Sequence, residues 1–245
     1  MILALLLLAA DPATPDVGWE RLKQDVHLLA TKPFQLDRAG KRQALFVAGA
    51  TLGLYGLRHE IRREVQEGRS EDRSDLLQHA RWMSRGAAAP VLALGAWGAS
   101  FVTHDPREKE TAQLLLTSAG MSAAIAGMGS FVLASERPED GDAVHLFRTS
   151  GHGVSLDASL AASIVPPLRC QYLRVRPGDG RPARWLKRGT LALLYAGAGL
   201  TALQRIDDDK HWAPDVFLGL VNGFTVGEML CHAREGRPPA PSPSG

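Results

Sequence analysis

Uncharged stretches rich in alanine, glycine and leucine alternate with charged blocks along the chain. These stretches do not show the β-branched alternation that is typical of strands, and their residue types favour helices. They cover roughly residues 43–57, 86–104, 111–135, 189–204 and 216–227, with a weaker stretch at 149–168 that Asp157 interrupts. The pattern therefore predicts an all-α fold, a helical bundle of about six core helices.

The stretch at 111–135, TAQLLLTSAGMSAAIAGMGSFVLAS, is long enough to cross a hydrocarbon core of about 30 Å. The other stretches lie at or below the usual spanning length. Small residues along them would let helices pack closely, as they do in membrane bundles. These features favour a membrane-embedded bundle. A mean hydropathy of -0.09 leaves a soluble helical domain with an Ala/Gly-rich core as the alternative.

Both ends of the chain are predicted to lie outside the bundle, which covers 16–231. Residues 1–15 begin with MILALLLLAA, which is too short to span a bilayer and has no basic residue before it. This segment fits either a signal peptide or a short anchor. Residues 232–245 are basic and then proline-rich, and we expect a disordered tail there.

Basic residues gather in one segment. The net charge of +2 gives no indication of a nucleic-acid partner, but residues 169–188 contain seven basic residues and one acid. Such segments stay on the cytoplasmic side of a membrane, which places 136–151 and 205–212 together on the opposite face. We therefore expect a bacterial-type inner-membrane protein whose segments 136–151 and 205–212 face the periplasm. The alternative is a soluble periplasmic protein. Segment 58–85 holds seven arginines beside six acids and is expected to form amphipathic surface helices.

Two polar features are assigned structural roles. Cys170 and Cys231 are expected to be free thiols, because two cysteines make no disulfide scaffold and show no zinc-ligand spacing. The aspartates of RIDDDKHWAPD (205–215) could suggest a metal site. Contiguous aspartates point in different directions, however, and there is no second ligand cluster, so we expect a solvated loop and no metal.

Three short motifs are expected to meet at one end of the bundle, where they would form a catalytic pocket. They are Arg137-Pro138, then Ser150-Gly151-His152, and then Arg205 with His211 and Asp215. A serine or threonine at a loop-to-helix junction caps the helix, and first-turn amides together with arginine forks bind phosphate oxygens. His211 lies four residues before Asp215, so a carboxylate could hold one ring nitrogen and leave the other free to attack.

Together these motifs resemble the type 2 phosphatidic acid phosphatase superfamily, which includes membrane lipid phosphatases, soluble bacterial acid phosphatases and vanadium haloperoxidases. The family pattern is Lys-x6-Arg-Pro, then Pro-Ser-Gly-His, then Ser-Arg-x5-His-x3-Asp. This chain retains RP, TSGH and QRIDDDKHWAPD, followed by the glycine-containing helix VFLGLVNGFTVG. The resemblance covers roughly 111–228.

The resemblance implies a phosphoric monoester hydrolase that acts on lipid phosphates of the phosphatidic acid or prenyl pyrophosphate type, without a cofactor. His211 would be the nucleophile that forms a phosphohistidine, Asp215 would orient it, and His152 would protonate the leaving alcohol. The phosphate-binding residues would be Arg137, Ser150, Gly151 and Arg205. The implied partners are a phosphorylated lipid, or a small phosphomonoester, and a membrane; the oligomeric state is not indicated.

Three motif positions depart from the family pattern. Ser130 stands at the lysine position, Thr149 at the proline before Ser-Gly-His and Gln204 at the serine before the arginine. Losing one preorganised charged donor costs about 10²–10³ in rate. A weakly active or non-catalytic relative is therefore one alternative, and a vanadate-dependent oxidase is disfavoured. The possible signal peptide and the low mean hydropathy indicate a second alternative, an exported, soluble acid phosphatase of broad specificity. The cations nearest in sequence that could replace the lysine are His145, Arg148 and Lys210.

Overall fold

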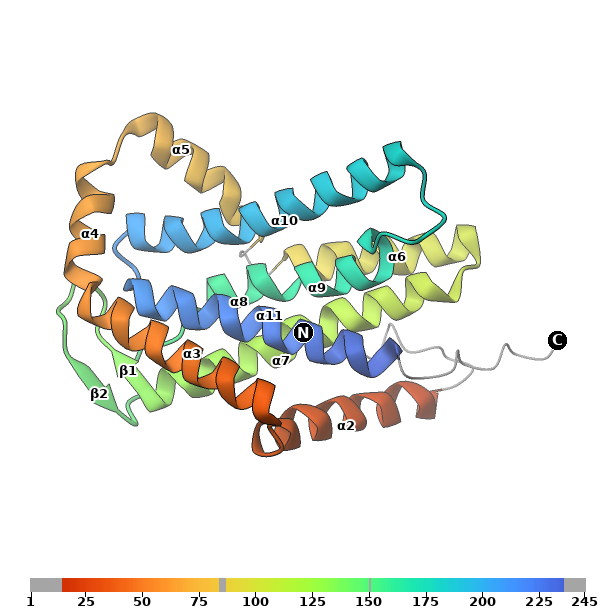
Figure 1. The fold of residues 1–245 in the computed structure, drawn as a ribbon, viewed down its shortest axis with the longest axis horizontal. Coiled ribbons are helices and arrows are strands. Elements are labelled where there is room, and N and C mark those ends of the chain that lie inside the picture. Colours follow the sequence, from red (N-terminus) through yellow and green to blue (C-terminus); the bar gives the residue numbers. More distant parts are fainter. Residues whose placement is uncertain (1–14, 84–86, 150, 236–245) are drawn as a thin grey trace.

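The computed structural model describes residues 15–83, 87–149 and 151–235, and long helices run side by side along its longest axis (Figure 1). The helices are α2 (Pro15–Thr31), α3 (Arg38–Gly56), α4 (Arg58–Glu67), α5 (Glu71–Ala80), α6 (Ala88–Thr103), α7 (Pro106–Val132), α8 (Leu156–Ser163), α9 (Val165–Leu168), α10 (Arg181–Asp207) and α11 (Ala213–Glu235). Shorter helical turns are η1 (Lys32–Phe34), η2 (Arg81–Met83) and η3 (Arg169–Leu173), and the strands are β1 (Leu133–Ser135) and β2 (Val144–Leu146). The predicted all-α fold is confirmed, with one small hairpin added.

The hairpin corrects the predicted helix at 111–135. Helix α7 ends at Val132, and Leu133 to Ser135 pair antiparallel with β2, with Leu133 opposite Leu146. Pro138 cannot continue a helix and disfavours helical backbone in the residue before it, so the chain turns here. The weaker stretch at 149–168 is also shorter than expected, because α8 begins at Leu156 after the N-cap Ser155.

The centre of the bundle is built by close contact between α11 and α8–α9. Gly219, Gly223 and Gly227 lie one turn apart on α11, and a Cβ on them would come within 2.5 Å of Ser155 O, 2.2 Å of Ser159 O and 2.8 Å of Pro166 Cγ. These glycines therefore let the helix backbones approach more closely than any side chain allows, as the abundance of small residues predicted.

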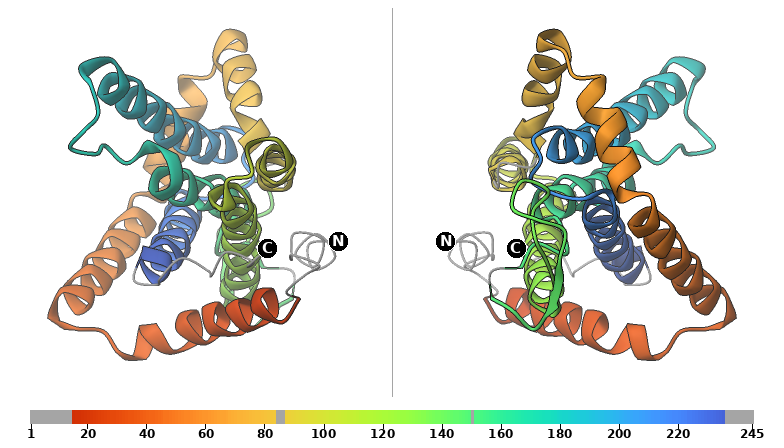
Figure 2. Two further views of the ribbon diagram at one scale, coloured as in Figure 1. Left: turned by 90° about the vertical axis from the view of Figure 1, so that its right-hand side faces the viewer. Right: turned by 90° about the vertical axis from the view of Figure 1, so that its left-hand side faces the viewer.

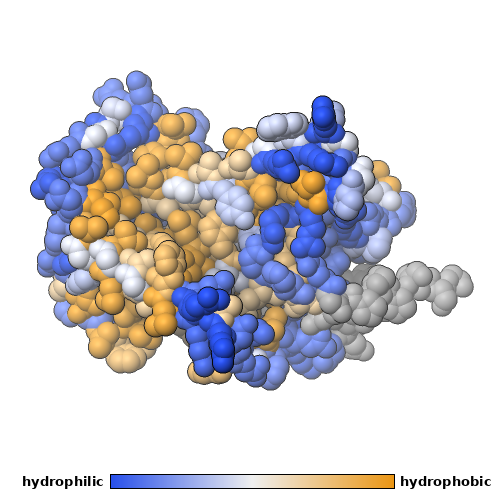
Figure 3. Space-filling view, viewed as in Figure 1, coloured by the Kyte–Doolittle hydropathy of each residue, from blue (hydrophilic) through white to orange (hydrophobic). Residues whose placement is uncertain are grey.

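The apolar surface lies mainly on the outer helices. Helix α3 has no buried residue, and it forms with α2 an outer frame beside α7 and α11 (Figure 2). One face shows a broad apolar region with hydrophilic regions toward both ends (Figure 3). By length and composition alone, α7 and α11 could each cross a membrane. Exposed apolar side chains occur on α3 (Leu45, Phe46, Leu52), α6 (Val91, Leu94, Phe101, Val102) and α7 (Met128, Phe131, Val132).

The acidic run at the end of α10 is not a solvated loop, which corrects the sequence-based expectation. Asp207 is 1% exposed and pairs with Arg73 of α5. Asp209 makes two bonds of 2.8 Å to Arg62 of α4, and Asp208 accepts from Gln204. Segment 58–85 does form helices, as predicted. Its arginines Arg62 and Arg73 form ion pairs that hold the acidic run in place. A long-range pairing of this kind leaves no local signal in the sequence.

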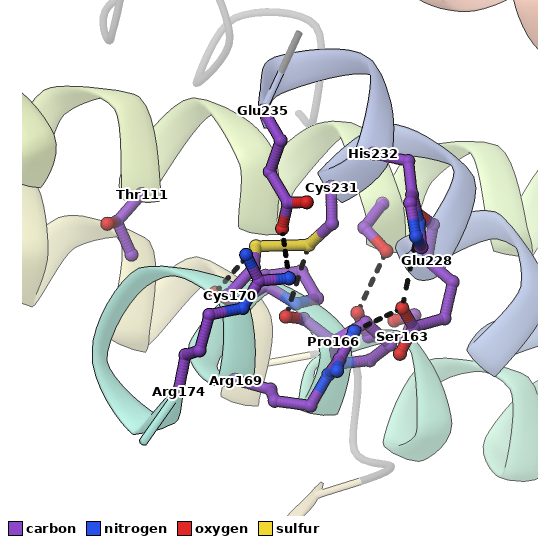
Figure 4. The surroundings of a disulfide bond; sticks show 12 residues. Thr111, Ser163, Pro166, Arg169, Cys170, Arg174, Glu228, Cys231, His232 and Glu235 are labelled. Carbon is purple, nitrogen blue, oxygen red and sulfur yellow. Dashed lines mark hydrogen bonds and ion pairs between the residues drawn. A yellow bond between two sulfur atoms is a disulfide. The ribbon is translucent and has the colours of Figure 1, made fainter. Parts of the chain in front are cut away.

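The two cysteines are joined by a disulfide rather than free, which is a second correction (Figure 4). The bond links η3 to the last turns of α11, and the ion pairs Arg169–Glu228 and Arg174–Glu235 join the same two elements. Cys231 is buried and its Cα lies 6.2 Å from that of Cys170. Because 61 residues separate the two cysteines, no local pattern in the sequence indicated that they pair.

The predicted bundle boundaries differ slightly from the observed helices. Residues 1–14, which contain nearly all of the proposed signal peptide or anchor, and residues 236–245 lie outside the described part of the chain. Helix α11 continues to Glu235, beyond the tail boundary expected at 232. Arg234 pairs with the fully buried Asp25 of α2, and this contact makes the first residues of the expected tail part of the fold.

Candidate active site

Three connections meet at one end of the bundle, on the left in Figure 1. They are the segment from β1 to β2, the loop between β2 and α8, and the short loop between α10 and α11. Each carries one of the three motifs. The backbone joins them, because His152 N donates to Ser135 O at 3.1 Å and Ser155 N donates to Asp215 O at 3.0 Å.

His211 is buried and held by the chain of the second motif. Its Nδ1 lies 3.1 Å from the carbonyl oxygen of His152. A carbonyl only accepts hydrogen bonds, so the proton resides on Nδ1 and the lone pair on Nε2 stays available. The two imidazole rings lie 6.1 Å apart between centroids and are nearly perpendicular, at 84°. The structure therefore brings the two predicted histidines together.

Asp215 acts differently from the simplest sequence-based interpretation. Its Oδ2 lies 3.7 Å from His211 Nδ1, which is an ion-pair distance rather than a hydrogen bond. The same oxygen accepts from Trp212 N at 3.0 Å and from Ser135 Oγ at 3.2 Å. An acceptor in the first turn that reaches back to the amide before the helix satisfies a donor at the start of α11. Asp215 thus fixes the helix start that carries His211 and presents its charge to the ring.

The glycines of the second motif are required by close approach to β1. A Cβ at Gly151 would lie 2.3 Å from Ala134 Cα, and one at Gly153 would lie 1.6 Å from Leu133 O. No side chain fits at either position while the backbone stays in place. Ser150, the predicted phosphate-binding hydroxyl between Thr149 and Gly151, lies outside the described residues.

The environment of His152 lowers its pKa. Burial of the ring is the largest cause, followed by the positive charge of Arg137 and the electrostatic influence of the neighbouring His211 ring. His152 consequently loses its proton at a lower pH than an ordinary histidine.

Both predicted phosphate-binding arginines face carboxylates. Arg137 Nη1 lies 3.6 Å from Glu139 Oε1, and Arg205 Nε lies 3.0 Å from Asp157 Oδ2 in the first turn of α8. The carbonyl of Arg205 accepts from His211 N at 3.2 Å, so this arginine is tied to the nucleophile candidate through the backbone. Two cations and two histidines converging on one end can bind and transfer a phosphoryl group.

Ser130 occupies the lysine position with a structural contact. Its hydroxyl donates to Val154 O at 2.8 Å and accepts from Val154 N at 3.2 Å. It thereby ties the end of α7 to the chain that follows Gly151-His152-Gly153. Gln204 is fully buried and bonds Asp208, whereas Thr149 is exposed.

Several residues of this end were not singled out in the sequence. Trp212 is 4% exposed and donates from Nε1 to Glu136 O at 3.0 Å, which joins the α10–α11 loop to the hairpin segment. Ser135 bonds Asp215, and Asp157 faces Arg205. Trp212 directly follows His211, and this adjacency was the available signal for it; the other contacts arise from tertiary packing alone.

In the described residues, no group of three histidine, cysteine or acidic side chains is placed to hold a metal ion. The aspartates after Ile206 instead pair with arginine and glutamine side chains of α4, α5 and α10.

No protein-family model and no curated protein match the sequence. Among solved structures, the chain is similar to the crystal structure of Aquifex aeolicus LpxE, with a TM-score of 0.52 and 19% sequence identity. The match covers 72% of this chain and 95% of that chain. At this identity the likeness shows a similar fold.

Proposed function

We propose that this chain, with the fold of the type 2 phosphatidic acid phosphatase superfamily, hydrolyses lipid phosphate monoesters through a phosphohistidine intermediate. The observation that carries the proposal is the fixed His211 ring. Its Nδ1 is held by the carbonyl of His152, so the neutral ring carries its lone pair on Nε2, and the second imidazole lies 6.1 Å away between ring centroids. A nucleophile oriented by one ring nitrogen and free at the other suits phosphoryl transfer.

The reaction proceeds in two steps. The Nε2 lone pair of His211 attacks phosphorus, the bond to the lipid oxygen breaks, and protonated His152 gives its proton to that oxygen. Water then attacks the phosphohistidine and passes a proton to His152, which releases inorganic phosphate and restores His211. Arg137, Arg205 and the chain at Ser150 and Gly151 hold the phosphate oxygens while charge develops on them.

A lipid substrate is favoured by the apolar surface beside the site. Leu133, Leu146 and Phe147 are exposed on the hairpin and the loop that follows it, next to exposed Phe131 and Val132 at the end of α7. Phe131 and Phe147 lie 6.0 Å apart between ring centroids. A phosphate headgroup at the histidines would leave its acyl or prenyl chains beside this surface, where burial of apolar area is favourable.

The proposed location is a bacterial-type inner membrane with the site on the periplasmic face. The basic segment 169–188 covers η3 and the start of α10, at the opposite end of the bundle from the hairpin, and favours the cytoplasmic side (Figure 1). In this orientation the Cys170–Cys231 disulfide would lie on the reducing side, where disulfides are rare, so the bond in the structure counts against the orientation. The redox state of both cysteines in cells alkylated before lysis tests it, and reduced thiols would support the orientation. A disulfide found in such cells would reverse the orientation. Release of the protein by carbonate washing would instead favour a soluble periplasmic phosphatase.

A second candidate function is binding of a phosphorylated lipid with little or no turnover. It is favoured by Ser130, whose hydroxyl bonds the Val154 backbone where the family pattern has a cation. Substituting lysine at 130 and finding a large rise in turnover would identify a weakened enzyme. Robust activity of the wild type rejects this second candidate.

Phosphate release from phosphatidic acid and from a prenyl pyrophosphate by the detergent-purified chain tests the proposal. His211→Ala should abolish release. His232→Ala is a matched control, because its side chain is 69% exposed at the far end of α11. Activity of the wild type that does not exceed that of His211→Ala rejects the hydrolase.

A further inference from the structure

Two cations of the candidate site share one carboxylate. The Nζ of Lys210 lies 2.7 and 2.9 Å from the two oxygens of Glu139, and Arg137 Nη1 lies 3.6 Å from one of them. The three side chains are 35–39% exposed, so a ligand can reach them. A carboxylate held between a lysine and a phosphate-binding arginine occupies the kind of place that phosphate oxygens take.

The backbone around Lys210 is fixed by the acidic run that precedes it. Asp209 has a φ of 54°, in the left-handed region, and its carboxylate is clamped by Arg62. The amides of Lys210 and His211 both donate to the carbonyl of Arg205, at 3.0 and 3.2 Å. Lys210 is therefore presented beside the nucleophile by a braced loop.

The two other cations that the sequence offered as replacements have a different partner. His145 Nε2 and Arg148 Nη1 lie 3.2 and 4.0 Å from Glu136 Oε1. The backbone of Glu136 is part of the hairpin, where its N–H bonds Ala143 O. Of the three candidates, Lys210 is the one whose carboxylate also contacts Arg137.

We propose that Lys210 binds the substrate phosphate in place of the lysine that the motif expects at position 130, and that Glu139 occupies this cation until phosphate displaces it. The inference rests on the proposed function. Lys210 and Arg137 would clamp the phosphate from one side, next to His152 and His211. Since Glu139 and phosphate compete for the same cations, removing the carboxylate strengthens phosphate binding and removing the lysine weakens it.

Calorimetric titration of the full-length chain with inorganic phosphate tests the proposal. We expect Lys210→Ala to bind phosphate about tenfold more weakly, as for a charge-assisted contact that is partly screened by solvent. Glu139→Gln should bind several-fold more tightly, and Lys210→Arg should stay within about threefold of wild type because it keeps the charge. If the Lys210–Glu139 ion pair only stabilised the loop, removing either partner would change the phosphate affinity in the same direction.

Lys187→Ala is the matched control, because Lys187 forms a similar ion pair of 2.8 Å with Asp179 at the opposite end and should leave binding unchanged. Thermal unfolding of each variant identifies a misfolded protein. If Lys210→Ala is misfolded, the phosphate affinity of Lys210→Arg is compared with that of Glu139→Gln instead. No phosphate binding by the wild type, no change in Lys210→Ala, or weaker binding in Glu139→Gln overturns the proposal.

Hydrolysis assays on the same samples separate this inference from the proposed function. An active wild type with unchanged binding in Lys210→Ala rejects the role of Lys210 and leaves the hydrolase intact. Opposite shifts of phosphate affinity in an inactive wild type support the role of Lys210 and reject the hydrolase.

Discussion

The Nδ1 atom of His211 lies 3.1 Å from the carbonyl oxygen of His152, closer than the 3.7 Å that separates it from Asp215. The backbone of one predicted motif thus fixes the ring of another, and the carboxylate four residues away supports it at longer range. This relationship gives Asp215 a smaller share in ring orientation than a direct hydrogen bond would.

Asp215→Asn should therefore be a mild variant. The amide oxygen can still accept from Trp212 N, and the His152 carbonyl still selects the Nδ1–H tautomer. We expect kcat/KM to fall about 10- to 100-fold, through loss of charge near the ring. In the serine protease triad, the equivalent change alters the tautomer and costs about 10⁴-fold. Steady-state kinetics of Asp215→Asn distinguish these two outcomes. A fall in kcat/KM of about 10⁴-fold would show that Asp215 sets the tautomer of His211.

The pH dependence of kcat/KM follows from the lowered pKa of His152, which must be protonated to act as an acid. The rate should fall as pH rises through that pKa, below the ordinary value of about 6.5. Arg137→Gln removes a positive charge that disfavours the protonated ring, so this limb should move to higher pH even though phosphate binding weakens. A limb that stays in place or moves to lower pH would contradict the assignment.

Gly153→Ala should disrupt the loop that carries His152, because the added Cβ would lie 1.6 Å from Leu133 O. Overpacking of this kind typically costs about 1–3 kcal/mol, and we expect a lower melting temperature and a loss of activity. Gly199→Ala is the control, since nothing lies within 4 Å of its Cβ and alanine favours the interior of α10. Equal melting temperatures for the two variants would show that the loop can move aside.

The Cys170–Cys231 disulfide should stabilise the fold without affecting catalysis. It closes a loop of 61 residues, for which the chain-entropy relation gives roughly 4 kcal/mol. Cys231 lies sixteen residues after Asp215 on one helix, about 24 Å along its axis. Reduction of the oxidised, purified chain should therefore lower the melting temperature while kcat stays the same. A parallel loss of kcat would mean that the far end of α11 is coupled to the site.

The motif spacing predicted that His152 and His211 lie close together, because each motif is local. His211 and Asp215 lie at the start of one helix, and glycine at 151 is required wherever the loop touches β1. Alanine- and glycine-rich stretches predicted the bundle for the same reason. The residues that favour a helix, and the small residues that let it pack closely, lie within a single segment. The catalytic and phosphate-binding roles of these residues stay predictions, and Ser150 also lies outside the described residues.

The errors concern contacts between distant segments. Asp207 and Asp209 resembled a solvated loop because Arg73 and Arg62, which neutralise them, lie more than a hundred residues earlier in the chain. The cysteines resembled free thiols because their pairing depends on how η3 meets α11. The carboxylates that hold Arg205 and Lys210 were missed for the same reason. Pairings of this kind depend on how whole helices pack, and the periodic pattern of residues along the sequence does not indicate them.

Trapping of the phosphoenzyme tests the central claim most directly. The purified chain is mixed with ³²P-labelled phosphatidic acid, quenched within milliseconds to seconds, and assayed for protein-bound phosphate that is labile in acid and stable in alkali. The account predicts such a label in the wild type and in His152→Ala, where the phosphohistidine should form slowly and persist, and none in His211→Ala. Label that survives in His211→Ala, or hydrolysis by the wild type without any labelled protein, would contradict it.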